Sequence, residues 1–206
     1  RIVKEGKRRD AYLWIEDQVK KGRQVYIICP LIHERGAVES TKAAETAGTM
    51  AQSGAETTTQ GSNTENAAHF FDETPQIKAA TAEFERLQKS VFPALRVGLL
   101  HGKLPPKEKD AMMEKFTKGE IDILVSTAVV EVGIDVPNAT IIIIEGAERF
   151  GLAQLHQFRG RVGRGEHQSY CFLFPTVEGA ALLERLRAMT THSSGFKLAE
   201  IDLQLR

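Results

Sequence analysis

The chain has 206 residues, of which 42% are hydrophobic, so it is long enough and apolar enough to bury a substantial core. Lys plus Arg number 27 and Asp plus Glu also number 27, and this zero formal charge excludes a uniformly basic protein that coats nucleic acid. Any nucleic-acid surface must therefore be local. The longest apolar runs, such as Thr140 to Ile144, are far shorter than the roughly 20 residues of a membrane helix, so no membrane partner is expected.

The two cysteines, Cys29 and Cys171, each lie inside an apolar run, where small buried thiols are common and a disulfide framework is not expected. The N-terminal residues lack the apolar core of a signal peptide. Both features favour the cytoplasm. The first residue is not Met and a patterned segment stops at Arg206, so we expect the chain to be a fragment.

Five short apolar runs are expected to be β-strands, and they are continuous rather than alternating, which is typical of strands covered on both faces. They span residues 25–29, 96–100, 121–126, 140–144 and 170–174. Helical spacing between them places Tyr12, Ile15 and Val19 on one face, Phe84, Leu87 and Val91 on another, and Met112, Met113 and Phe116 on a third, after Pro105 and Pro106.

This alternation predicts an α/β fold: an open, mainly parallel sheet with helices on both faces, whose ligands bind beyond the carboxyl ends of the strands. The functional loops are then expected after Cys29, Leu100, Ser126 and Glu145. Residues 39–69 differ from this pattern because they contain no Leu, Ile, Val, Phe, Tyr or Trp. They cannot contribute a core, so we expect a low-complexity insertion that is dispensable for folding.

The strongest chemical signal is the run from Gln154 to Gly165, which places Arg159, Arg161 and Arg164 within six residues, separated by glycines. A guanidinium makes planar, bidentate contacts to phosphate oxygens, and glycine lets the backbone approach closely. The run follows a helix-like segment and precedes a strand, and we expect it at the ligand edge of the sheet. A solvated basic turn is the alternative.

A second signal, from Ser126 to Pro137, directly follows a strand. A hydroxyl pair at a strand end can grip a phosphate, and Gly133 allows a tight turn that presents the Asp135 carboxylate to a ribose hydroxyl. An ordinary connection, with Asp135 bonded to backbone amides, is an equally good interpretation of these residues.

Together the two runs closely resemble motifs V and VI of superfamily 2 helicases, and the resemblance extends to Val25–Pro30, which is similar to motif IV, and to Val97–Gly102 in the strand that follows. The residues at 29–32, 131–138 and 148–165 resemble the RecG family of branched-DNA helicases in particular. Residues 196–206 resemble the start of the translocation motif that this family shares with the transcription-repair coupling factor.

The resemblance implies that residues 1–176 are the second RecA-like motor domain, and that 177–206 form a C-terminal helix and a truncated translocation motif. No phosphate-binding loop of Gly, four residues, Gly, Lys, then Ser or Thr is present, and no strand ends in a paired acidic motif. ATP with Mg²⁺ would therefore be held mainly by an absent N-terminal motor domain, and the fragment is expected to be inactive by itself. No metal site is assigned, because the histidines and cysteines lack ligand spacing.

The resemblance also implies roles for individual residues. Arg164 and Arg161 would act as arginine fingers on the γ-phosphate, and Gln157 would sense that phosphate or the attacking water. The remaining roles are as follows: Gly133 and Asp135 at the nucleotide sugar, Ser126, Thr127, His101 and Gly102 at the DNA backbone, and Gly195, Phe196, Asp202 and Arg206 in coupling ATP hydrolysis to movement on DNA.

The implied function is an ATP-dependent translocase that remodels replication forks and recombination junctions in the bacterial, nucleoid-associated cytoplasm. Its partners would be branched or forked DNA and the N-terminal motor and DNA-binding domains of the same parent chain. Two alternatives stay open: the equivalent domain of the transcription-repair coupling factor, and a non-catalytic nucleic-acid-binding module.

Overall fold

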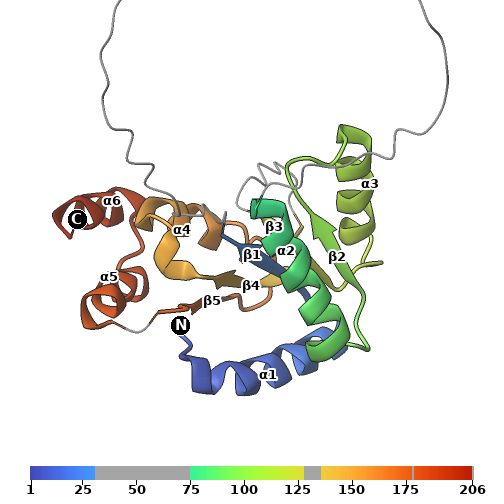
Figure 1. Cartoon of the computed structure of the whole chain (residues 1–206), viewed down its shortest axis with the longest axis horizontal. Helices are drawn as coiled ribbons and strands as arrows, with labels where there is room; N and C mark the ends of the chain where they lie inside the picture. The colour runs from blue at the N-terminus through green and yellow to red at the C-terminus, as the bar shows by residue number, and fades with distance from the viewer. Residues whose placement is uncertain (31–74, 128–135, 178, 206) are drawn as a thin grey trace, which may run out of the picture. The chain divides into compact units, whose positions relative to one another are not determined.

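The central element is a five-stranded sheet in which all neighbouring strands are parallel (Figure 1). The structure is a computed structural model, and it describes residues 1–30, 75–127, 136–177 and 179–205. The strands are β1 (Gln24–Cys29), β2 (Val97–Leu100), β3 (Ile123–Thr127), β4 (Ala139–Glu145) and β5 (Tyr170–Phe174), in the order β2-β3-β1-β4-β5. The predicted open parallel sheet is confirmed. The insertion expected at residues 39–69 lies outside the described residues.

Helices cover both faces of the sheet, as expected. One face carries α1 (Arg8–Lys20), preceded by the short η1 (Glu5–Lys7), and α2 (Pro75–Arg86), which continues into the π-turn η2 (Leu87–Val91). The other carries α3 (Pro106–Thr117), α4 (Leu152–Arg159) after the short η3 (Ala147–Arg149), α5 (Ala180–Thr191) and α6 (Gly195–Gln204).

The two faces form separate cores because successive side chains of a strand point in opposite directions. In β1, Tyr26 and Ile28 enter the core beneath α3 and α4, whereas Val25 and Ile27 enter the core beneath α1 and α2. Every residue of β1 is buried. This double burial explains why the strands appear in the sequence as continuous apolar runs.

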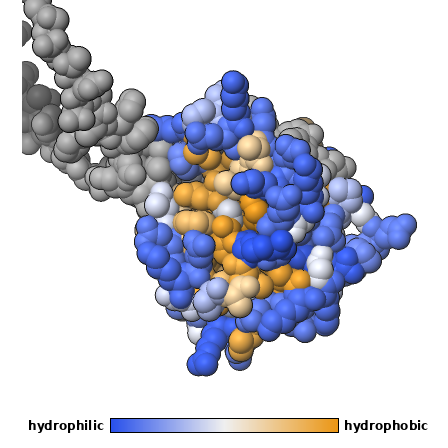
Figure 2. All heavy atoms as spheres, turned by 90° about the vertical axis from the view of Figure 1, so that its right-hand side faces the viewer, coloured by the Kyte–Doolittle hydropathy of each residue, from blue (hydrophilic) through white to orange (hydrophobic). Residues whose placement is uncertain are grey.

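The two edges of the sheet differ. Beside β5, Ile2 forms a parallel bridge with Leu173, whereas β2 has β3 as its one strand neighbour among the described residues. Figure 2 looks onto the side of the molecule where β2 and α3 lie, and shows apolar surface within a hydrophilic rim. Val97 and Leu99 of β2 are half-buried, so this edge is covered less completely than the centre of the sheet.

Two details differ from the sequence-based expectations. The third strand begins at Ile123 rather than 121, because Ile121 is buried against the α3 side and its carbonyl accepts a bond from the Gln24 side chain at 2.9 Å. The segment from Gly195, in which the spacing of the apolar residues fits a strand and a helix equally well, is the helix α6. Its first turn is capped by the Ser194 hydroxyl, which accepts from the Lys197 amide at 3.5 Å.

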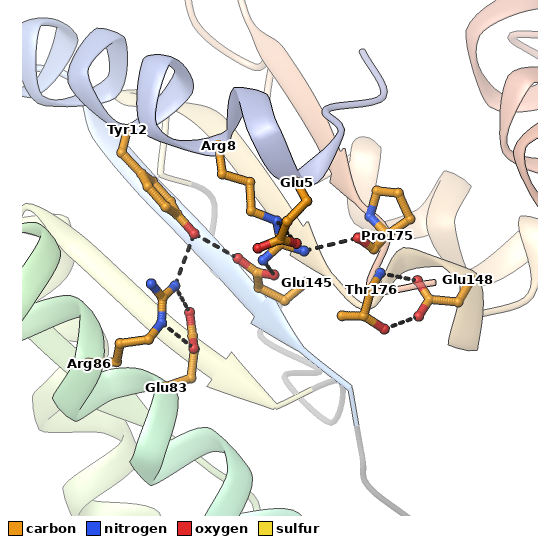
Figure 3. Close-up of polar contacts among 9 residues, drawn as sticks. All are labelled: Glu5, Arg8, Tyr12, Glu83, Arg86, Glu145, Glu148, Pro175 and Thr176. Atoms are coloured by element: carbon orange, nitrogen blue, oxygen red, sulfur yellow. Dashed lines mark hydrogen bonds and ion pairs between the residues drawn. The ribbon is translucent and has the colours of Figure 1, made fainter. Parts of the chain in front are cut away.

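A polar cluster around the buried carboxylate of Glu145 joins α1 and α2 to the end of β4 (Figure 3). It consists of Arg8, Tyr12, Glu83, Arg86 and Glu145, and we call it the Glu145 cluster. Glu145 pairs with Arg8 at 3.1 Å and accepts from the Tyr12 hydroxyl at 3.1 Å. Arg86 donates to that hydroxyl at 3.0 Å and holds Glu83 at 2.6 Å. Burial raises the pKa of Glu145 to about 7, although the charge of Arg8 opposes this shift.

We expect Glu145 to make the stability of the purified chain depend on pH. Folding raises the pKa of this carboxyl from 4.5 to about 7. Below pH 4.5 the group therefore contributes its full stabilisation to the folded state, and this contribution is lost as the pH rises through about 7. The contribution is on the order of 3 kcal/mol. Urea unfolding at pH 5.5 and pH 8 should show a smaller pH dependence for Glu145→Gln than for the wild type.

Glu85→Gln is the matched control, since Glu85 lies on the surface of α2, where it pairs with Lys89. It should leave the pH dependence unchanged. An unchanged pH dependence in Glu145→Gln would contradict the assignment.

Candidate functional site

Helix α4 carries the predicted ATP-site residues on its exposed side and at its end. It buries Leu152, Leu155 and Phe158 in the core, and this leaves Gln157 exposed. In the loop that follows, Arg161 is half-buried and Arg164 is exposed. The Arg164 Nε donates to the Gly160 carbonyl at 3.3 Å. The structure therefore places Gln157, Arg161 and Arg164 on one helix and the loop directly after it.

The loop after α4 depends on glycine at two positions. Gly163 has a φ of +90°, a conformation that other residues rarely adopt. A Cβ at Gly165 would lie 2.6 Å from the Pro137 carbonyl oxygen, so a side chain there would force the two segments apart. The loop with Arg161 and Arg164 is thus pressed against the end of the second predicted motif. Gly133 and Asp135 of that motif lie outside the described residues.

The expectation that this loop lies at the carboxyl edge of the sheet is wrong. Pro137 lies just before β4. The carbonyl of the next residue, Asn138, accepts a hydrogen bond of 3.1 Å from the amide of Gln24, which begins β1. Gly165 is packed against Pro137, so the loop lies at the amino edge. The physical reason is that a helix between two parallel strands must run back along the sheet, so its last turn is at the edge where the next strand begins.

Arg159, the first arginine of the run, is bonded inside the domain. Its guanidinium donates to the carbonyls of Met189 at 2.8 Å, His192 at 3.1 Å and Ser193 at 3.1 Å, and also contacts the ring of His156 at 2.9 Å. These carbonyls belong to the end of α5 and the turn before α6. Arg159 therefore joins α4 to the C-terminal helices.

The predicted DNA-contact residues lie at the opposite, carboxyl edge. His101 is half-buried and Gly102 is exposed in the loop after β2, where the Gly102 carbonyl accepts from the Lys109 ammonium at 2.6 Å. Ser126 and Thr127 end β3, with exposed fractions of 0% and 2%, and the Ser126 hydroxyl donates to the Thr127 carbonyl at 2.8 Å. A DNA contact through these two hydroxyls would require them to become accessible, and it stays a prediction.

The predicted coupling residues have different environments. A Cβ at Gly195 would lie 2.7 Å from the His156 ring, so glycine lets α6 approach α4 closely. Asp202 is buried and pairs with Arg185 of α5 at 3.1 Å. Phe196 is 85% exposed, and Arg206 lies outside the described residues. Gly195 and Asp202 therefore fix α6 in place, whereas Phe196 lies on its surface.

Neither a metal cluster nor a membrane span is found in the part of the chain that the structure describes. No group of three His, Cys, Asp or Glu side chains there could hold a metal ion. No described helix is both long and apolar enough to cross a membrane.

Sequence reasoning missed two residues near the end of β4. Glu145 is the buried acid of the Glu145 cluster, and the signal for it was an acidic residue that ends a run of four isoleucine positions. Arg149 is exposed beside a cavity at the same strand end. Arg149 belongs to the RecG-like segment 148–165, but that resemblance gave it no role.

Comparison with known proteins identifies a family. The model of the helicase conserved C-terminal domain matches residues 58–166, just over half of the chain. The chain is 41% identical over 197 residues to the ATP-dependent DNA helicase RecG of Thermotoga maritima, covering 96% of the chain and 20% of that protein. It is 44% identical over 206 residues to RecG of Aquifex aeolicus, and this match covers 98% of the chain and 21% of that protein. The chain thus spans about a fifth of the length of these relatives.

Solved structures agree with this result. A structure of RecG bound to a three-way DNA junction matches with a TM-score of 0.68 and 38% identity, covering all of this chain and 22% of that one. Domain 2 of the DEAD-box helicase Mss116p, bound to an RNA duplex, matches with a TM-score of 0.56 over 93% of this chain and 59% of that one, but at 18% identity it supports the fold only. The predicted resemblance to RecG is confirmed, and the chain belongs to the family of helicase conserved C-terminal domains.

Proposed function

We propose that this chain is the second motor domain of a RecG-type, ATP-dependent DNA translocase that remodels replication forks and recombination junctions. The identity of about 41–44% to RecG helicases supports this function over that of the transcription-repair coupling factor. The three-way DNA junction to which the similar RecG structure is bound supports branched DNA as the substrate. An N-terminal motor domain and a DNA-binding domain would belong to the same parent protein, in the bacterial cytoplasm.

The observation that carries the proposal is the contact between Gly165 and Pro137, which brings the ends of the two sequence motifs together. Arg161 and Arg164 lie on this loop, whereas Arg159 is engaged with carbonyls of the C-terminal helices. This loop thus carries two guanidinium groups that would reach a neighbouring motor domain holding ATP and Mg²⁺.

The arginines would act by electrostatics rather than by covalent chemistry. In phosphoryl transfer, negative charge spreads over the oxygens of the transferred group, and a preorganised guanidinium stabilises that charge. Gln157, exposed on the same helix, would orient the attacking water or sense the γ-phosphate. Gly133 and Asp135 would contact the nucleotide sugar. These roles make the ATP site a shared one, to which this chain contributes one side.

The opposite edge would contact DNA. The loop at His101 and Gly102, with Ser126 and Thr127 beside it on the next strand, would touch backbone phosphates, which carry no sequence information. Residues Gly195 to Arg206 would couple ATP hydrolysis to movement on the duplex. The bonds from Arg159 to the turn before α6 support this coupling, because they connect that segment to the helix that bears Gln157.

In the full-length parent, Arg164→Ala should lower the turnover number for ATP by about 10³ to 10⁵ while leaving KM nearly unchanged. The reason is that an arginine finger acts mainly on the transition state. Arg161→Ala should behave similarly, with a larger effect on KM. Steady-state ATP hydrolysis with saturating forked DNA measures both quantities. Arg187→Ala, which changes an exposed arginine on α5, serves as the control, and wild-type turnover in both finger variants would refute their role.

The purified chain by itself should hydrolyse ATP negligibly, with or without DNA. It contributes the arginine side of the site but lacks a phosphate-binding loop and the paired acids that position Mg²⁺ and water. A phosphate-release assay measures this. Robust DNA-stimulated turnover that Arg164→Ala abolishes would contradict the shared site and would require a complete ATP site within this chain.

Arg206→Ala in the parent should retain most DNA-stimulated ATP hydrolysis but lose the unwinding of forks and junctions. The coupling segment transmits movement rather than contacting the nucleotide, so its loss separates the two activities. Parallel ATPase and strand-separation assays test this, with Arg164→Ala as the variant that loses both. Proportionate losses in both assays, or no loss in either, would exclude a coupling role for Arg206.

A further inference from the structure

The connections that follow β1 and β4 lead to opposite faces of the sheet. Helix α2, which follows β1 in the chain, packs in the core with α1, whereas α4, which follows β4, packs in the other core. β1 and β4 are direct neighbours in the sheet. Where connections diverge in this way, a parallel sheet leaves a crevice beyond the carboxyl ends of the two strands, and such crevices bind ligands in many α/β proteins.

A cavity of about 210 Å³ occupies this position. Its walls include Cys29 at the end of β1, Glu145 at the end of β4 and Thr176 after β5. Arg8, Glu83 and Arg149 contribute from α1, α2 and η3. Among the described residues, none of those predicted to contact nucleotide or DNA lines it.

The cavity's carboxylates are already paired. Glu145 is held by Arg8 and Tyr12, and Glu83 by Arg86 through contacts of 2.6 Å and 2.9 Å (Figure 3). The nearby Glu148 carboxylate accepts from the amide and the hydroxyl of Thr176.

Arg149 is different. Its side chain is exposed, and within the described ranges no residue bonds its guanidinium. A planar guanidinium whose donors no described residue uses suits a phosphate group at the mouth of a crevice, because it can bind the phosphate through two parallel N–H donors.

We propose that Arg149 binds a backbone phosphate of the DNA along which the domain moves. This inference rests on the proposed function. The cavity lies at the same carboxyl edge as the predicted DNA-contact loop at His101 and Gly102. That loop follows β2, and three strand spacings separate β2 from β4, which corresponds to about 14 Å. Phosphates of one strand advance roughly 3.4 Å along the duplex axis per nucleotide, which is much less than this separation, so Arg149 would contact a different phosphate from that loop.

The test is the salt dependence of DNA binding by the full-length parent. Affinity for a forked duplex is measured by fluorescence anisotropy across a range of salt concentrations for the wild type, Arg149→Ala, Arg149→Lys and Arg187→Ala. Losing one phosphate contact should lower the slope of log K against log salt by about 0.9 and weaken binding roughly fivefold at low salt. The Arg149→Lys variant should show most of the wild-type slope, and the Arg187→Ala variant should show the full wild-type slope.

A second measurement identifies the source of the phosphate. ADP affinity should be the same in Arg149→Ala and the wild type, because the proposed ligand is DNA and the predicted nucleotide side is the opposite edge. Weaker ADP binding with an unchanged salt slope would assign the site to a nucleotide phosphate and overturn the proposal. An unchanged slope together with unchanged ADP binding would also overturn it.

These outcomes are separable from the proposed function. If DNA-stimulated ATP hydrolysis in the parent depends on Arg164 but the slope is unaffected by Arg149→Ala, only the Arg149 assignment fails. Folding of the variant is checked by thermal unfolding, and it should match the wild type because the exposed guanidinium has no partner among the described residues.

Discussion

In a parallel sheet, each helix must return the chain from the carboxyl edge to the amino edge, and this constraint places the loop after α4 and the loop after β2 on opposite edges. Helix α4 leaves the end of β4 and delivers Arg161 and Arg164 to the amino edge, where Gly165 packs against Pro137. The loop after β2 remains at the carboxyl edge. Under the proposed function, one edge would face the nucleotide and the other the DNA, and the helices that span the sheet would connect the two.

These arginines divide into two groups according to their exposure. Arg159 and Arg185 are used inside the domain: the first bonds carbonyls at the end of α5, and the second pairs with the buried Asp202. Buried guanidinium groups need such acceptors, because an unpaired buried charge is costly. Arg164 and Arg149 are exposed, at opposite edges of the sheet. The internal arginines fix the C-terminal helices to α4, the helix that also bears Gln157.

The strands could be predicted from the sequence because strands buried on both faces of the sheet appear as continuous apolar runs. The buried faces of the helices could be predicted because apolar residues at helical spacing lie on one side of a helix. Ile15 and Val19 are buried in α1 as the spacing indicates. The sequence did not predict the partners of Arg159, because the carbonyls that it bonds lie about 30 residues later in the chain. The edge on which the Arg161 loop lies was assigned wrongly, although the direction of a parallel crossover determines it. The sequence does not distinguish a strand from a helix after Gly195, because the apolar residues there fit both the two-residue period of a strand and the 3.6-residue period of a helix.

The Glu145 cluster connects the fold to the carboxyl edge. Glu145 extends the apolar face of β4 by one polar residue, and its partners Arg8 and Tyr12 come from the helix on the opposite side of the crevice from α4. This pairing holds the ends of β4 and α1 together beneath the cavity. The pairing also satisfies the carboxylate, so the negative charge at the base of the crevice is compensated internally. Among the described residues that line the cavity, the exposed guanidinium of Arg149 is then the charged group left for a ligand.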